Sequence, residues 1–140
     1  MLFIATSEVF SMMVGSEVTP ASRVYRMQPT VTGSIGIAGA VRASLTLRCS
    51  HATAAGIASQ MLGIAEQAQA HACDAVGEIC NMVAGHFKAK VGLEAECMLS
   101  VPLVIQGNDY EIQPVKDAER IDVPLLYQGE LLEVTLEIHP

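Results

Sequence analysis

Four residues suited to binding or positioning a reacting group fall within one twelve-residue stretch, residues 74–85. They are two acids, an amide and a glycine: Asp74, Glu78, Asn81 and Gly85. Their spacing of four, three and four residues places them on one face of a helix, because residues three or four apart are neighbours on a helix surface. A carboxylate can attract a cation, and an amide offers both an acceptor and donors that can hold a water molecule. The stretch therefore predicts a polar helix face, of which Glu78 and Asn81 are the expected working residues.

The opposite face of the same helix is apolar. At about 100° per residue, five apolar side chains lie within about 60° of one direction, and the four polar-face residues lie between about 140° and 200° from it. The apolar positions are Val76, Ile79, Cys80, Val83 and Phe87. Gly85 inside a helix costs about 1 kcal/mol relative to alanine, and could allow another surface to approach closely. Spacing alone leaves one alternative open, a polar face that is only solvated.

The remainder of the chain predicts helices and antiparallel hairpins in blocks. Helices are expected at residues 3–14, 50–62 and 65–90, and glycine is expected to end each of them, with Ser50 as the N-cap of the second. Apolar alternation predicts a hairpin over residues 31–47, a strand over 94–105 with Pro102 at an edge or strand end, and a hairpin over 121–139. Short strands are expected at residues 24–27 and 110–114. This pattern indicates one α+β domain over residues 1–140, with helices packed on one face of an antiparallel sheet.

Residues 7–15 align without gaps on residues 77–85, at an offset of 70 residues, which is half the length of the chain. Each of the two helices is followed by a hairpin, so the sequence suggests an internally duplicated, pseudo-two-fold fold. Glu8 corresponds to Glu78, but Ser11 stands where the second copy has Asn81. Because the serine side chain is short, we expect one working site, on the second helix.

Composition excludes several classes of function. The net charge is −7 and the eight Lys and Arg residues are scattered, which argues against binding to nucleic acid or to an anionic membrane. No apolar run is long enough to span a bilayer, and the N-terminus has no basic flank of a signal peptide. The four cysteines form no Cys-x-x-Cys pair, and they are expected to be reduced and buried, which fits the cytoplasm. The histidines lack the spacing of metal ligands, so no metal site is expected.

Asp74, Glu78, Asn81 and Pro102 together resemble the signature of the CheC/CheX/FliY family of chemotaxis phosphatases. In that family an acidic or serine residue precedes a Glu-x-x-Asn pair on a helix, and a proline follows some twenty residues later. The order of helices and hairpins over the whole chain resembles the family as well. Because Ser11 breaks the motif in the first copy, the chain resembles the CheX type, with one site per chain.

The resemblance implies a protein phosphatase that hydrolyses the aspartyl phosphate of a CheY-like response regulator. Asn81 would orient the attacking water, Glu78 would pair with the regulator's active-site lysine, and Asp74 and Gly85 would contact the partner. It also implies that Mg²⁺ is bound by the receiver domain, with no cofactor held by this chain, and that the protein is a homodimer paired through sheet edges. The alternative is a non-catalytic adaptor that docks on a receiver domain or a flagellar switch.

Overall fold

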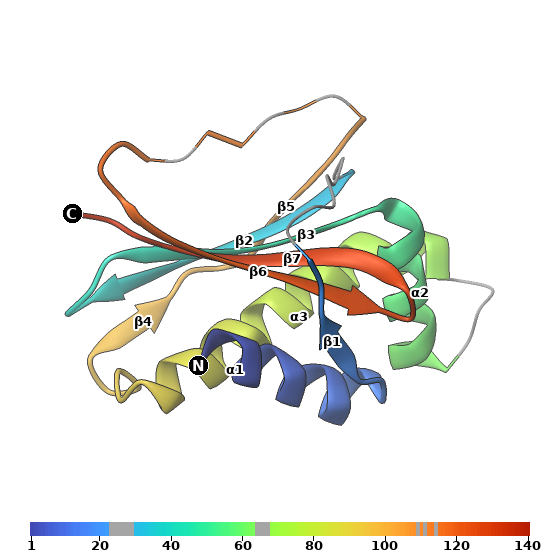
Figure 1. Ribbon diagram of the computed structural model, residues 1–140, viewed down its shortest axis with the longest axis horizontal. Coiled ribbons are helices and arrows are strands. Elements are labelled where there is room, and N and C mark those ends of the chain that lie inside the picture. Colours follow the sequence, from blue (N-terminus) through green and yellow to red (C-terminus); the bar gives the residue numbers. More distant parts are fainter. Residues whose placement is uncertain (23–29, 64–67, 109, 111, 114) are drawn as a thin grey trace.

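The computed structural model describes residues 1–140 except residues 23–29, 64–67, 109, 111 and 114 (Figure 1). The predicted strand at residues 24–27 therefore lies outside the described residues. The described helices are α1 (Leu2–Val9), which continues as the π-helical turn η1 (Phe10–Val14), α2 (His51–Leu62) and α3 (Ala68–Lys90). The described strands are β1 (Val18–Pro20), β2 (Val31–Gly39), β3 (Ala43–Cys49), β4 (Cys97–Leu99), β5 (Leu103–Gln106), β6 (Glu119–Tyr127) and β7 (Glu130–Ile138).

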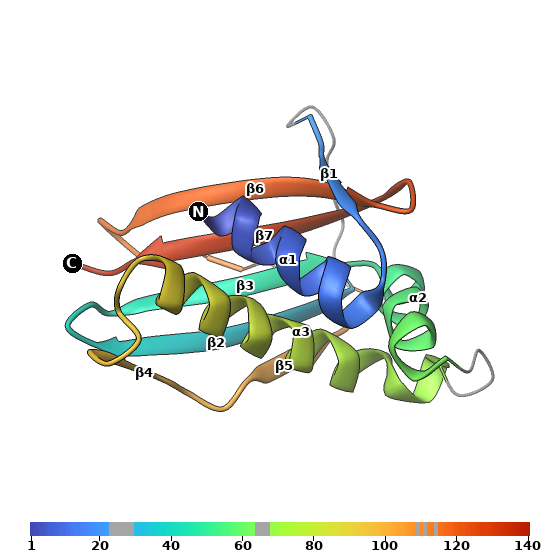
Figure 2. The same cartoon turned by 90° about the horizontal axis from the view of Figure 1, so that it is seen from below.

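All seven strands join one antiparallel sheet in the order β1-β6-β7-β3-β2-β4, and β5 also pairs with β2. The helices lie on one face of this sheet, α3 beneath β2 and β3 and α1 beneath β6 and β7 (Figures 1 and 2). The predicted α+β architecture, with helices on one face of an antiparallel sheet, is confirmed. The hairpins β2–β3 and β6–β7 meet at the central β3–β7 pair. The predicted internal duplication of the chain stays a prediction.

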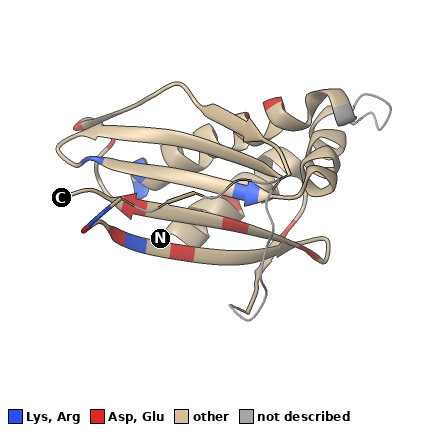
Figure 3. Cartoon of the chain, turned by 90° about the horizontal axis from the view of Figure 1, so that it is seen from above, with Lys and Arg blue, Asp and Glu red and all other residues tan. Residues whose placement is uncertain are grey.

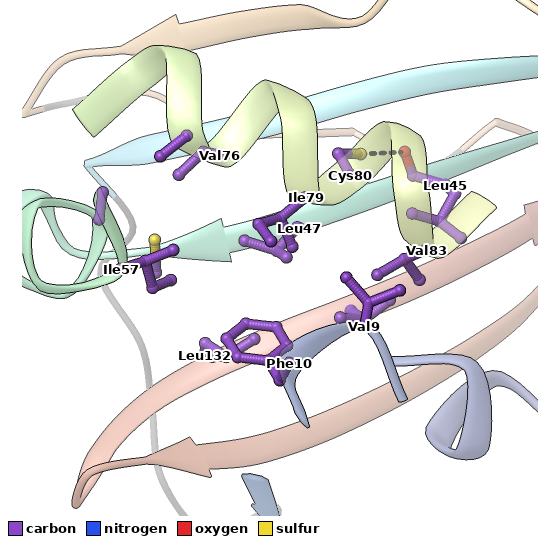
Figure 4. Packing of buried hydrophobic residues seen from close by; sticks show 14 of the residues in the cluster. Val9, Phe10, Leu45, Leu47, Ile57, Val76, Ile79, Cys80, Val83 and Leu132 are labelled. Carbon is purple, nitrogen blue, oxygen red and sulfur yellow. Dashed lines mark hydrogen bonds between the residues drawn. The ribbon is translucent and has the colours of Figure 1, made fainter. Parts of the chain in front are cut away.

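The hydrophobic core fills the space between the helices and the sheet (Figure 4). Ile79 and Val83 of α3, together with Val9 of α1, are fully buried against Leu45 of β3 and Leu132 of β7. A fully buried aliphatic side chain contributes about 1.5–3 kcal/mol relative to an exposed one. The alternating pattern of the strands and the apolar stripe of α3 therefore meet in one core.

The helix ends follow the local sequence signals. Ser50 caps α2, because its Oγ accepts a hydrogen bond from the Thr53 backbone N–H at 3.0 Å. Gly63 ends the same helix in the left-handed conformation at φ +68°, which glycine adopts without a steric penalty. Gly15 ends η1 in the same way at φ +76°. These three ends agree with the predicted helix boundaries, although the turn after Val9 is π-helical rather than α-helical.

The predicted strand over residues 94–105 is wrong as a single element. It consists of two short strands, β4 and β5, separated at Ser100, Val101 and Pro102. Proline has no N–H to donate to a ladder, so the strand breaks there, and Ser100 instead donates its backbone N–H to the Gly36 carbonyl at 2.9 Å. Val101 and Leu103, on either side of Pro102, are 87% and 61% exposed.

Two further predictions need correction. The described residues 110, 112 and 113 form no strand, and β6 begins at Glu119, before the predicted start of the hairpin at residue 121. The short strand β1 was not predicted, since a three-residue strand ending in Pro20 has no alternating pattern.

Figure 3 shows the sheet face that looks away from the helices, where charged residues of both signs lie along the strands. Arg48 there forms an ion pair with Glu133 of the neighbouring strand β7.

Candidate functional site

The predicted working residues lie on the outer surface of α3. Asp74, Glu78 and Asn81 are all exposed, and the side chain of Asp74 is 87% exposed. The apolar stripe on the other side of the helix faces the sheet: Val76, Ile79, Cys80 and Val83 have no exposed surface. Packing of this stripe therefore determines which way the polar side chains point. We call Asp74, Glu78 and Asn81 the acidic–amide stripe.

Two glycines let α3 approach the sheet closely. A Cβ atom added to Gly33 of β2 would lie 2.9 Å from Val76 Cγ1, closer than real Cβ atoms approach other atoms. On α3 itself, a Cβ atom at Gly77 would lie 3.1 Å from Val104 Cγ2 and 3.9 Å from Pro102 Cβ. Pro102 therefore lies beside the turn of α3 that carries Glu78. The sequence pattern placed Pro102 only at a strand end and gave no sign of this contact.

The carboxylates of the stripe lack strong partners among the residues that the structure describes. Glu78 forms no hydrogen bond or ion pair with any residue that the structure describes, and the basic side chain beside Asp74 is that of His71, with Nδ1 3.9 Å from Oδ2. The corresponding acid of the first copy is different. Glu8 of α1 accepts from Lys90 Nζ at 2.7 Å and lies 3.4 Å from His86 Nδ1.

These neighbours change the chemistry of Glu8. The hydrogen bond from Lys90, with a further contribution from His86, lowers the pKa of the Glu8 carboxyl below its ordinary value, against the opposing effect of desolvation. Glu8 is thus held in an interhelical ion pair between α1 and α3. Ser11, which corresponds to Asn81, is exposed and lies in η1. Within the described part of the chain, the segment on α3 presents its glutamate without a strong partner, whereas the segment on α1 does not.

A cleft between α2 and α3 adjoins the stripe, with a volume of about 130 Å³. It is lined by Ala58, Met61, Leu62, His71, Asp74, Ala75 and Glu78. The sequence pattern gives no sign of the contributions of α2, because nothing in the pattern of either helix indicates which turns of the two helices face each other. Leu62 is 48% exposed at the end of α2, an apolar side chain next to two acids.

Gly85 lies one turn beyond Asn81, and a Cβ atom added to it would meet no atom within 4 Å. Glycine is therefore not required there by packing within the chain. Packing among the described residues does not explain why a residue that lowers helix stability stands here. Its presence is compatible with the predicted close approach of another molecule.

No three His, Cys, Asp or Glu side chains come together to hold a metal ion within the described part of the chain. The cysteines of the described residues are free thiols. Burial raises the pKa of the Cys49 and Cys80 thiols to about 12, so neither is a thiolate near neutral pH. Cys73, predicted to be buried, is only half-buried, and its Sγ donates to Gln106 Oε1 at 3.1 Å. None of the described helices has the length and apolar composition needed to cross a bilayer.

A known protein family matches most of the chain. The family model described as chemotaxis phosphatase CheX matches residues 31–126, well over half of the chain. The chain belongs to the CheX family. The matched region contains α3 and all three residues of the acidic–amide stripe. Among curated proteins, none matches the sequence significantly.

Solved structures of CheX proteins share the fold over almost the whole chain. CheX from Vibrio vulnificus is 25% identical, with a TM-score of 0.84, and the match covers 99% of this chain and 93% of that one. CheX from Desulfovibrio desulfuricans is also 25% identical, with a TM-score of 0.83 and coverage of 99% and 96%. A structure of CheX from Borrelia burgdorferi in a complex with CheY, BeF₃ and Mg²⁺ has a TM-score of 0.79 at 23% identity, covering 99% and 96%. At that identity, the last likeness shows the fold alone.

Proposed function

We propose that this CheX-family protein hydrolyses the aspartyl phosphate of a CheY-like response regulator, with Asn81 and Glu78 as the residues that act on the partner. The observation that carries the proposal is the exposed Glu78–Asn81 pair on α3, which lacks internal partners among the described residues. The pair lies within the region that matches a family of chemotaxis phosphatases. The Borrelia relative is recorded in a complex with CheY, which supports a receiver domain as the partner.

The role of Asn81 is to orient the attacking water. An acyl phosphate is already reactive, and phosphoryl transfer depends mainly on positioning and electrostatics. The Asn81 amide is neutral and carries an acceptor and donors, so it can hold a water in line with the phosphorus without repelling the phosphoryl oxygens. A carboxylate in the same place would repel them.

Glu78 places the receiver relative to Asn81, and Asp74 contacts the receiver beside it. Glu78 is three residues before Asn81, so the two side chains are neighbours on the surface of α3. Pairing of Glu78 with the active-site lysine of the receiver would fix the direction from which Asn81 enters. Mg²⁺ belongs to the receiver in this proposal, where it would neutralise negative charge on the phosphoryl group. A receiver partner would place the protein in the cytoplasm.

The test follows loss of phosphate from a phosphorylated CheY-like receiver domain. Wild-type protein is expected to accelerate the loss, and Asn81→Ala is expected to lower kcat by about 100-fold, because catalysis rests on positioning. The matched control is Asn108→Ala, since Asn108 is the other asparagine of the chain and is exposed in a loop. Both variants should keep the stability of the wild type to within about 0.5 kcal/mol, as exposed substitutions generally do. Full activity in Asn81→Ala would refute the mechanism, and binding without acceleration by the wild type would favour the adaptor.

Gly85→Ala tests the close approach. The substitution should stabilise α3 by up to about 1 kcal/mol, because alanine is the better helix former and the space is open. If the receiver packs against Gly85, the same variant binds more weakly although it is more stable. A variant that is more stable and binds equally well would remove Gly85 from the partner-binding surface.

The proposal includes a homodimer paired through the β4–β5 edge. Met98, Val101 and Leu103 along this edge are 79%, 87% and 61% exposed, and residues 97–107 contain no charged side chain. An uncharged apolar edge invites pairing with a second strand, whereas charged residues such as those at the start of β6 discourage it. Light scattering should show a dimer, and Leu103→Lys should shift it to a monomer. A wild-type monomer at high protein concentration would contradict this assignment.

A further inference from the structure

The cleft between α2 and α3 combines an apolar lining with two carboxylates and the imidazole of His71. Ala58 and Ala75 are buried at its base, and Leu62 is half-exposed at the end of α2. Asp74 and Glu78, one helical turn apart, are exposed beside these apolar groups. The cleft is thus amphipathic, with acidic groups on α3 and an apolar side chain facing them from α2.

The size of the cleft restricts what it can hold. Pockets for drug-sized molecules have volumes of about 300–1,000 Å³, whereas this cleft measures about 130 Å³. It has room for a single side chain rather than for a free cofactor or metabolite. The occupant is therefore part of a larger molecule whose surface lies over α3, as a bound receiver domain would.

Charge identifies the kind of side chain. Among the described residues, the one basic side chain close to a carboxylate of the cleft is His71, with Nδ1 3.9 Å from Asp74 Oδ2. The protein does supply a close lysine for an acid elsewhere, as the Glu8–Lys90 pair at 2.7 Å shows. Lysine and arginine lay their aliphatic stems on apolar surface while the charged group reaches a polar partner. A basic side chain matches both parts of this lining.

We propose that the cleft seats a second basic side chain of the receiver, with its stem against Leu62 and its charge at Asp74. This inference rests on the proposed function, in which Glu78 pairs with the active-site lysine. Because Asp74 precedes Glu78 by four residues, the two cations of the receiver must lie about 6 Å apart along α3. A receiver that lacks the second cation would leave the Asp74 side of the cleft empty. Asp74 and Leu62 are accordingly specificity-determining residues, and neither takes part in the chemical step.

The experiment compares Asp74→Lys and Leu62→Ser with the wild type, using one phosphorylated CheY-like receiver domain as substrate. Both variants should raise KM, Asp74→Lys by about tenfold since it replaces an attraction with a repulsion, and both should keep kcat within about twofold. The effect of Asp74→Lys should shrink at high salt, because exposed charges are screened. Glu94→Lys is the matched control, with the same change of charge beyond the far end of α3, and it should leave KM unchanged.

A charge reversal in the receiver completes the test. Each lysine or arginine around the receiver's phosphorylation site is changed to glutamate in turn, and one of these variants should recover a low KM with Asp74→Lys. Unchanged KM in both Asp74→Lys and Leu62→Ser, or a fall in kcat alone, would overturn the inference.

The proposed phosphatase activity can fail separately. If wild-type protein does not accelerate phosphate loss, the affinity for the same receiver loaded with beryllofluoride and Mg²⁺ replaces KM as the measured quantity. Weaker binding by Asp74→Lys would then support the cleft without the phosphatase. Absence of any binding by the wild type would overturn both.

Discussion

Replacing Gly33 with alanine should destabilise the protein through the contact that positions α3. The new Cβ would lie 2.9 Å from Val76 Cγ1, 3.4 Å from Cys80 Cβ and 3.4 Å from the Val76 carbonyl oxygen. Val76 cannot turn aside easily, since β-branched side chains in helices are held in one χ1 rotamer and this one is fully buried. The helix must therefore move away from β2 or the core must distort.

The cost can be estimated from known overpacking effects. Adding atoms to a packed core costs about 1–3 kcal/mol, and removing a glycine from a strand returns about 0.5–1 kcal/mol. The net loss should be about 1–2 kcal/mol, which corresponds to a fall in Tm of about 4–8 °C for a chain of this size. Urea unfolding gives the free energy, and thermal unfolding gives Tm.

Gly36→Ala is the matched control, because it makes the same change in the same strand. A Cβ atom at Gly36 would meet only Ser100, at 3.4 Å from Oγ and 3.7 Å from Cβ, which is ordinary contact distance. Gly36→Ala should therefore be neutral or slightly stabilising. The reasoning fails if Gly33→Ala proves as stable as Gly36→Ala. If the two differ as expected, Gly33→Ala should also reduce phosphatase activity, since a displacement of about 1 Å can cost about 100-fold.

Two further predictions concern titratable groups. The lowered pKa of Glu8 means that its ion pair with Lys90 stabilises the fold above the ordinary glutamate pKa of about 4.3, and that this contribution disappears as the pH falls through the lower pKa of the folded state. The unfolding free energies of the wild type and Glu8→Gln should therefore differ at pH 7 and converge towards pH 3, and a difference that grows on acidification would contradict the assignment. Burial raises the pKa of Cys80 to about 12, so on the order of 10⁻⁴ of it is thiolate at pH 8. Iodoacetamide should label half-buried Cys73 in the folded protein before Cys80, and mass spectrometry would refute this by finding equal labelling rates.

The orientation of α3 could be predicted because its periodicity extends over many turns. Five apolar positions at helical spacing define one direction, and four of them are fully buried while the fifth, Phe87, packs against the core partly buried. This pattern needs no knowledge of the partner surface. It correctly predicted that Glu78 and Asn81 lie on the exposed side of α3. Their role in catalysis stays a prediction.

The edge of the sheet could not be predicted in the same way. Alternation over residues 94–105 suggested one strand, but the contact of Pro102 with the turn of α3 at Gly77 is long-range and has no periodic signal. The cleft beside the acidic–amide stripe could not be predicted for a related reason. Leu62 lies in a short, alanine-rich helix, and its closeness to Asp74 depends on how α2 turns back onto α3.

The two repeated segments show how one residue type serves opposite purposes in the same fold. Glu8 and Glu78 occupy equivalent positions in sequence, yet Lys90 and His86 reach only Glu8. Both of these basic side chains come from the last turns of α3, so the helix that carries Glu78, which has no partner among the described residues, also pairs with Glu8. A carboxylate held at 2.7 Å from an ammonium group is poorly placed to attract a cation from another protein. Loss of the amide at Ser11 and pairing of Glu8 therefore act in the same direction: under the proposed function, they would leave a receiver one glutamate and one amide to recognise on each chain.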